Sequence, residues 1–124
     1  MNRTIGRCII FACATIIAYL SLSSGELQKW GDFTYLDKVQ HLMAYSSFAF
    51  ISCACVGNWR QRWMVAIGIL LFSASIEWLQ GYVGRETSLF DLAANGTGIL
   101  TGLLSYRIWG LYRPRWVKSL YSIR

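Results

Sequence analysis

The chain alternates long apolar runs with short polar segments. Four runs, at roughly residues 5–22, 39–56, 63–80 and 89–111, are interrupted by few charges. Each is close to the roughly 20 helical residues that cross a hydrocarbon core of about 30 Å. In lipid, only helices and closed barrels satisfy the backbone, and these runs are too long and too uniformly apolar for barrel strands. The pattern therefore predicts an all-α, polytopic membrane protein: a four-transmembrane-helix bundle whose second helix starts at Asp37.

The segments between the runs are polar and differ in length. Residues 21–36 form the longest connection, the basic segment 57–62 (GNWRQR) and the polar segment 81–88 are predicted as short turns, and Pro114 ends the last helix. The basic tail, residues 112–124, is expected either to lie along the membrane surface or to be disordered. We expect residues 1–124 to form a single domain.

Composition agrees with this arrangement. Of the 124 residues, 55% are hydrophobic and only 15% are charged. The formal net charge of +6 does not indicate a nucleic-acid partner, because the basic residues fall between the apolar runs rather than on one soluble face. Four cysteines lie within the first two runs without the spacing of a metal motif, so they are expected to be small apolar side chains.

The distribution of basic residues predicts the orientation. Nine of the twelve lysines and arginines fall on the side of the two termini and of the 57–62 turn, and three fall on the other side. The positive-inside rule then places both termini in the cytoplasm of a bacterial inner membrane. All six carboxylates fall on the opposite, extracytoplasmic side. A cleaved signal peptide is an alternative for the first run, but no A-x-A-like site follows it.

Three of the predicted helices carry a polar stripe toward that extracytoplasmic end. Positions three or four apart share a helical face. The stripes are, in chain order, Asp37 with His41, then Ser73 with Glu77 and Gln80, then Ser88 with Asp91 and Asn95. An acid facing lipid at the centre of a membrane costs about 2.5–3.5 kcal/mol, so these side chains are expected to face one another inside the bundle.

Other interpretations of these residues remain open. Asp37 and Ser88 are residue types that commonly cap helices. Asn95 could serve as an interhelical hydrogen-bonding residue, and the whole set could be a structural polar knot. Gly98 and Gly102 form a small-xxx-small pattern, which predicts that the fourth helix packs closely along nearly the same face.

The stretches DKVQHLMAY and EWLQGYVGRETSLFDLAANGTGILTG resemble the VanZ-like family of small bacterial membrane proteins. The family pattern is D-K-x-x-H, E-x-x-Q, G-R and D-x-x-x-N-x-x-G. Its elements stand here as Asp37, Lys38, His41, Glu77, Gln80, Gly84, Arg85, Asp91, Asn95 and Gly98. The resemblance covers residues 37–104. The family is named for a protein associated with teicoplanin resistance. The resemblance implies a small integral membrane protein of that family, and no established reaction goes with it.

Two hypotheses for function follow, together with a third in which the polar cluster is purely structural. In the first, the polar end binds the head group of an anionic envelope lipid or cell-wall precursor, through Asp37, Lys38, Gln80, Arg85 and Asn95. In the second, the protein is a membrane-embedded enzyme that acts on a lipid-linked substrate. Its candidate catalytic residues are His41, Glu77 and Asp91, acting by acid–base chemistry. In the third, the protein is an interaction protein in which the cluster is structural.

The sequence predicts neither a metal site nor a cofactor. One histidine and three carboxylates are ligand types for a divalent metal, but they lack the HExxH spacing of a metalloprotease. The expected partner is a membrane lipid or lipid-linked precursor.

Overall fold

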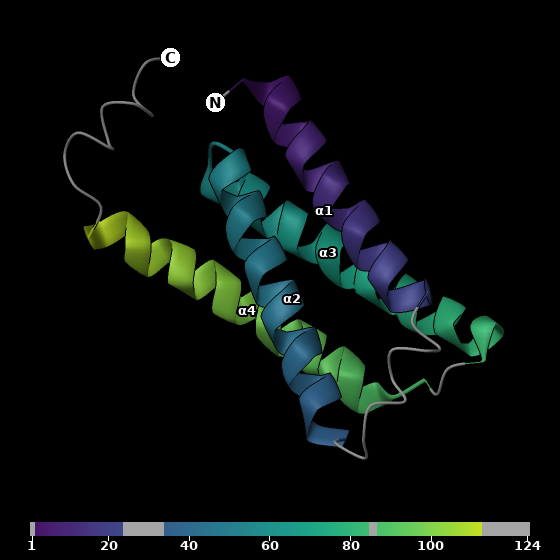
Figure 1. Cartoon of the computed structure of the whole chain (residues 1–124). Helices are drawn as coiled ribbons and strands as arrows, with labels where there is room; N and C mark the ends of the chain where they lie inside the picture. Colours follow the sequence, from purple (N-terminus) through teal and green to yellow (C-terminus); the bar gives the residue numbers. More distant parts are fainter. Residues whose placement is uncertain (1, 24–33, 85–86, 113–124) are drawn as a thin grey trace.

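The computed structural model describes residues 2–23, 34–84 and 87–112, and these residues are helical nearly throughout (Figure 1). The helices are α1 (Arg3–Ser23), α2 (Thr34–Cys55), α3 (Trp59–Gln80) and α4 (Leu89–Tyr112), with a 3₁₀ turn, η2 (Gly81–Val83), after α3. They alternate in direction, so the start of α1, the α2–α3 turn and the end of α4 share one end of the bundle. The all-α prediction is confirmed. The basic tail beyond residue 112 lies outside the described residues.

Two helix starts differ from the prediction. Helix α2 begins at Thr34, so Asp37 lies within its first turn instead of starting it. Helix α3 begins at Trp59, because Asn58 and Gln61 form a capping box: the Asn58 side chain accepts from the Gln61 backbone N–H at 2.8 Å, and the Gln61 side chain accepts from the Asn58 backbone. The segment 57–62, predicted as a turn, is therefore mostly helix.

Two of the described helical segments have the length and apolarity of membrane spans. They are Arg3–Ser23, with a hydropathy of 2.0, and Trp59–Val83, with a hydropathy of 1.5. Helices α2 and α4 have 22 and 24 residues, which is long enough to cross, but they carry more polar side chains. Large apolar side chains on the outside, such as Phe11 (74% exposed) and Leu71 (65% exposed), agree with a lipid environment.

Helices α2 and α4 make the closest contact in the bundle, and it runs along the glycines of α4. A Cβ added at Gly98 would lie 2.5 Å from the Leu42 carbonyl oxygen, and one at Gly102 would lie 2.8 Å from the Ala49 Cβ. Only glycine, whose side chain is a single hydrogen atom, fits between the two backbones at these positions. This confirms that α4 packs inward along this face. The core continues with buried apolar residues of α2, α3 and α4: Tyr45, Phe48, Ala49, Cys53, Ala66, Ile69, Ile99, Leu103 and Tyr106.

Arg62 makes hydrogen bonds at the C-terminal end of α2. Its guanidinium donates to the backbone oxygens of Cys53 (3.2 Å), Val56 (3.2 Å) and Gly57 (3.3 Å), and it lies 4.8 Å from the centre of the Tyr106 ring. The last backbone carbonyls of a helix lack hydrogen-bond donors within that helix. The Arg62 guanidinium, from α3, supplies donors to the carbonyls at the end of α2 and just after it.

Candidate functional site

The predicted polar stripes meet at one end of the bundle, and Asn95 is the residue that joins them. Its side chain is almost completely buried. Its Nδ2 donates to Ser73 Oγ at 2.8 Å, and its Oδ1 lies 3.0 Å from His41 Nδ1. One amide thus links α2, α3 and α4. The expected convergence of the three faces is present.

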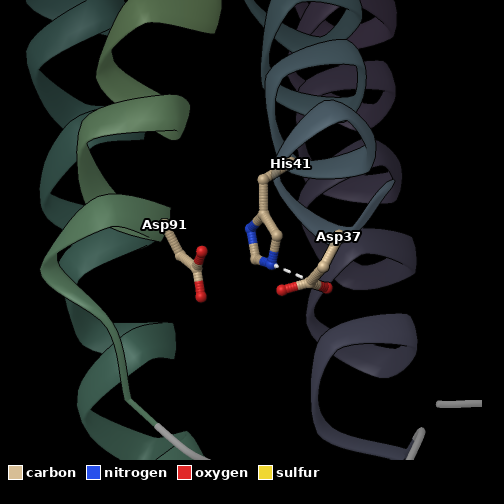
Figure 2. Close-up of side chains that lie close together, drawn as sticks. All are labelled: Asp37, His41 and Asp91. Atoms are coloured by element: carbon tan, nitrogen blue, oxygen red, sulfur yellow. Dashed lines mark ion pairs between the residues drawn. The ribbon is translucent and has the colours of Figure 1, made fainter. Parts of the chain in front are cut away.

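Carboxylates surround His41. The Asp37 Oδ1 atom lies 3.7 Å from His41 Nε2, and Glu77 Oε1 lies 4.0 Å from His41 Nδ1. Asp91 reaches toward the imidazole from α4, on the side opposite Asp37 (Figure 2). His41 is therefore set between acids from three helices, an arrangement that suits proton transfer, cation binding or a fixed polar core.

Lys38 and Asp91 form an ion pair between α2 and α4. Lys38 Nζ lies 3.1 Å from Asp91 Oδ1. The Lys38 side chain is 31% exposed, whereas that of Asp91 is 9% exposed. The pair therefore stands at the boundary of the cluster, with the lysine on the accessible side.

The remaining predicted residues do not all join this network. Gln80 is buried and its Nε2 donates to the Ser21 backbone oxygen at 3.1 Å, which ties α3 to the last turn of α1. Sequence reasoning missed this link, because nothing in the sequence pairs Gln80 with a backbone carbonyl of the first helix. Arg85 lies outside the described residues.

The two capping interpretations have different outcomes. Ser88 caps α4, since its Oγ accepts from the Phe90 backbone N–H at 3.2 Å. Asp37 does not cap α2, because it lies inside the helix, and its carboxylate is directed at His41. Its position on the polar face, rather than at a helix end, explains why it is part of the cluster.

A groove opens beside Glu77. It has a volume of about 380 Å³, and its lining comes from the end of α3, the turn that follows and the start of α4: Glu77, Trp78, Gly81, Tyr82, Thr87, Ser88, Leu89 and Leu92. Its volume falls in the range of small-ligand sites. Sequence periodicity did not find it, because the space lies between the end of α3 and the start of α4 and not along the face of one helix.

Metal ligation is geometrically feasible at one place among the described residues. One ligand atom from each of Asp37, His41 and Asp91 can be chosen so that all three lie within 4.8 Å of one another. Two of these residues are one turn apart on α2, and the third comes from α4.

The family resemblance extends further than the motifs. The model of the family described as VanZ/LLP1 matches residues 4–110, which include the first helix as well as the polar end. No curated protein and no solved structure shows a significant match to the chain. The family match spans most of the sequence, and five of the residues that carry the resemblance, Asp37, His41, Glu77, Asp91 and Asn95, lie at the polar end of the bundle, so the chain belongs to the VanZ/LLP1 family.

Proposed function

We propose that the polar end of this bundle binds the head group of an anionic envelope lipid or lipid-linked cell-wall precursor. The supporting observation is the groove beside Glu77, which joins a buried polar network to apolar walls. Trp78, Tyr82 and Leu89 line it and are 64%, 73% and 84% exposed. An amphipathic ligand needs both kinds of surface, and a head group bound there would leave its chains against exposed apolar side chains.

The charges suit a head group that carries both acceptors and donors. Lys38, partly exposed and paired with the buried Asp91, is a cation at the boundary of the polar cluster, and in this proposal it contacts a phosphate. Arg85 is proposed from the sequence as a second cation and lies outside the described residues. Glu77 lines the groove and would accept a hydrogen bond from a hydroxyl or amino group of the same ligand. Asp37 and Asn95 hold His41 in place behind this contact.

The proposal includes a membrane topology. All four helices would cross the inner membrane, with both termini in the cytoplasm and the groove at the extracytoplasmic surface. The lengths of α2 and α4 support two further spans beside α1 and α3, and their polar side chains would be covered by one another.

Native mass spectrometry tests the head-group site. Protein purified in mild detergent with a metal chelator should retain a phospholipid or polyprenyl phosphate. Thr87→Trp, which fills the groove, and Lys38→Met, which removes the cation, should each lower the retained fraction several-fold. Thr97→Trp is the matched control, because Thr97 is exposed on α4 away from the groove lining. No retained lipid, or equal retention in all four proteins, would refute the site.

One observation favours an enzymatic alternative. His41 lies between Asp37 and Glu77, at 3.7 Å and 4.0 Å, which suits an acid–base group that acts on a bound lipid. Catalysis predicts that His41→Gln abolishes turnover of the retained lipid while binding persists. A purely structural cluster predicts instead that Glu77→Gln lowers thermal stability, and that there is no bound ligand for the substitution to affect.

A further inference from the structure

We propose that the end of the bundle opposite the polar cluster binds an anionic phospholipid, in a pocket between the start of α1 and the start of α3. This basic pocket has a volume of about 500 Å³, and the end of α2 and the α2–α3 turn complete its walls. It shares no lining residue with the groove beside Glu77, so the inference does not depend on the proposed head-group site. The charged and amide side chains of its lining are Arg3, Arg7, Asn58 and Gln61.

The two arginines give the basic pocket its charge. Arg3 and Arg7 are four residues apart, so they lie on one face of α1, and both are exposed. Within the described residues, no ion pair or hydrogen bond involves either guanidinium. The described carboxylates lie at the other end of the bundle, those of Asp37, Glu77 and Asp91. The charges that the described part of the chain places at this pocket are therefore positive.

The capping box of α3 orients the two amides of the pocket. The Gln61 side-chain oxygen accepts from the backbone N–H groups of Gly57 (3.1 Å) and Asn58 (3.4 Å). The Asn58 side-chain oxygen accepts from the Gln61 backbone N–H at 2.8 Å. Since an amide accepts through its oxygen and donates through its nitrogen, these bonds fix which atom is which. Among the described contacts, the two NH₂ groups have no partner, and they are donors.

Backbone oxygens of the same turn are already engaged. Val56 and Gly57 line the basic pocket, and their carbonyl oxygens accept from the Arg62 guanidinium at 3.2 Å and 3.3 Å. The pocket thus offers guanidinium and amide N–H donors to a ligand. A phosphate diester, which is anionic and carries several acceptor oxygens, matches this set, and arginine binds phosphate through two parallel hydrogen bonds.

The lining becomes apolar toward the middle of the bundle. Ile10 follows Arg7 on α1 by three residues, about 4.5 Å at helical rise, and Met64 follows Gln61 on α3 by the same number. Helices α1 and α3 run in the same direction from this end, so both walls change from polar to apolar in the same order (Figure 1). Met64 is 62% exposed. A ligand whose charged group adjoins hydrocarbon chains fits this order, whereas a free phosphate would leave the apolar wall uncovered.

Arginines at this end could also serve only to orient the protein in the membrane. That role depends on the number of basic residues near the spans, so one arginine there would replace another. A binding pocket instead distinguishes its lining arginines from the rest. Arg60 and Arg107 are exposed and lie outside the lining, and Arg107 lies 5.9 Å from the centre of the Trp59 ring, which places it at the same end. They form a matched comparison for Arg3 and Arg7.

Native mass spectrometry of delipidated protein, titrated with phosphatidylglycerol, measures the binding. Every protein carries Thr87→Trp, which fills the groove at the other end. We expect Arg3→Gln with Arg7→Gln to lower the affinity by about ten-fold or more, because each cation near an anionic lipid contributes roughly five-fold. Arg60→Gln with Arg107→Gln removes the same charge and should stay within about two-fold of the parent protein. Thermal unfolding checks that each protein is folded.

Two competitors identify the class of ligand. Phosphatidylcholine has the same chains without net charge and should bind about five-fold more weakly or worse. Glycerol phosphate has the charge without the chains and should not displace phosphatidylglycerol. Equal losses of affinity in the two double variants, equal binding of the two phospholipids, or displacement by glycerol phosphate would overturn the proposal.

Photochemical cross-linking locates the bound lipid. Phosphatidylglycerol with a diazirine in one acyl chain should form adducts with the apolar wall of the basic pocket, at Ile10, Met64 or Val65. These adducts should decrease in the variant with Arg3→Gln and Arg7→Gln and persist in the variant with Arg60→Gln and Arg107→Gln. Adducts confined to other parts of the helices would refute the site.

Discussion

Asn95 of α4 donates a 2.8 Å hydrogen bond to Ser73 of α3, in a buried position where neither side chain meets solvent. The same amide contacts His41 of α2 at 3.0 Å. A single side chain therefore sets the spacing of three helices at the polar end. Because Ser73 is fully buried and the His41 side chain is only 11% exposed, removing Asn95 would cost hydrogen bonds that water replaces poorly.

Asn95→Leu should destabilise the bundle by about 1–2 kcal/mol, because it breaks two interhelical contacts at once. Denaturation in a mixed-detergent titration measures the change. The control is Thr97→Val, since the exposed Thr97 hydroxyl donates only to the Ala93 carbonyl of its own helix among the described contacts. Equal effects of the two substitutions would contradict the central role of Asn95.

The glycine contact between α2 and α4 predicts a second effect of substitution on stability. Gly98→Ala should destabilise by about 1–3 kcal/mol, because the new methyl group would overlap the Leu42 carbonyl and the backbones would have to separate. Gly68→Ala is the matched control: a Cβ there meets nothing within 4 Å, so the higher helix propensity of alanine should leave stability unchanged or raise it by up to about 1 kcal/mol. Thermal unfolding in one detergent compares them, and a stable Gly98→Ala protein would show that the close contact is absent.

The hydrogen bonds of Arg62 predict a third effect on stability. Arg62→Lys keeps the charge but loses the fork of donors that reaches the carbonyls of Cys53, Val56 and Gly57. We expect a loss of about 1–2 kcal/mol, consistent with several charge-assisted hydrogen bonds to one helix end. Arg60→Lys, at an exposed position two residues away, should change stability by less than about 0.5 kcal/mol. The same unfolding assay checks both.

The proposed four-span topology makes a prediction about sidedness. In a protein whose four native cysteines are replaced by alanine, Arg60→Cys should be protected from a membrane-impermeant maleimide in intact cells, and Thr87→Cys should react. If only α1 and α3 crossed, with the N-terminus inside, the pattern would be reversed. Labelling after cell lysis is the control that both cysteines can react.

The sequence predicted the helices and their polar faces well, because both depend on spacing along a single chain. Asp37 and His41, four residues apart, lie on one face in the structure as helical periodicity requires. The start of α3 was predicted four residues too late, since the capping box of Asn58 and Gln61 was read as a polar turn. The signal was present in that N-x-x-Q spacing.

Contacts between helices were less predictable. The cost of exposing acids to lipid predicted that the stripes would meet, but not which atoms would pair. That Lys38 contacts Asp91, and that Gln80 instead reaches the Ser21 carbonyl, depends on helix rotation and on the length of the connections. Neither quantity is contained in the pattern of a single helix.

The glycine contact also has a mechanical consequence. Gly98 lies seven residues from Asp91 along α4, about 10 Å at helical rise. Because the backbones of α2 and α4 touch at Gly98, that point acts as a pivot for the pair. A change of about 10° in the crossing angle would move Asp91 by about 2 Å relative to His41. The separation of those two side chains thus depends on the angle between α2 and α4 at Gly98. In a bilayer, a change of hydrophobic thickness that altered the tilt of these helices would change this separation.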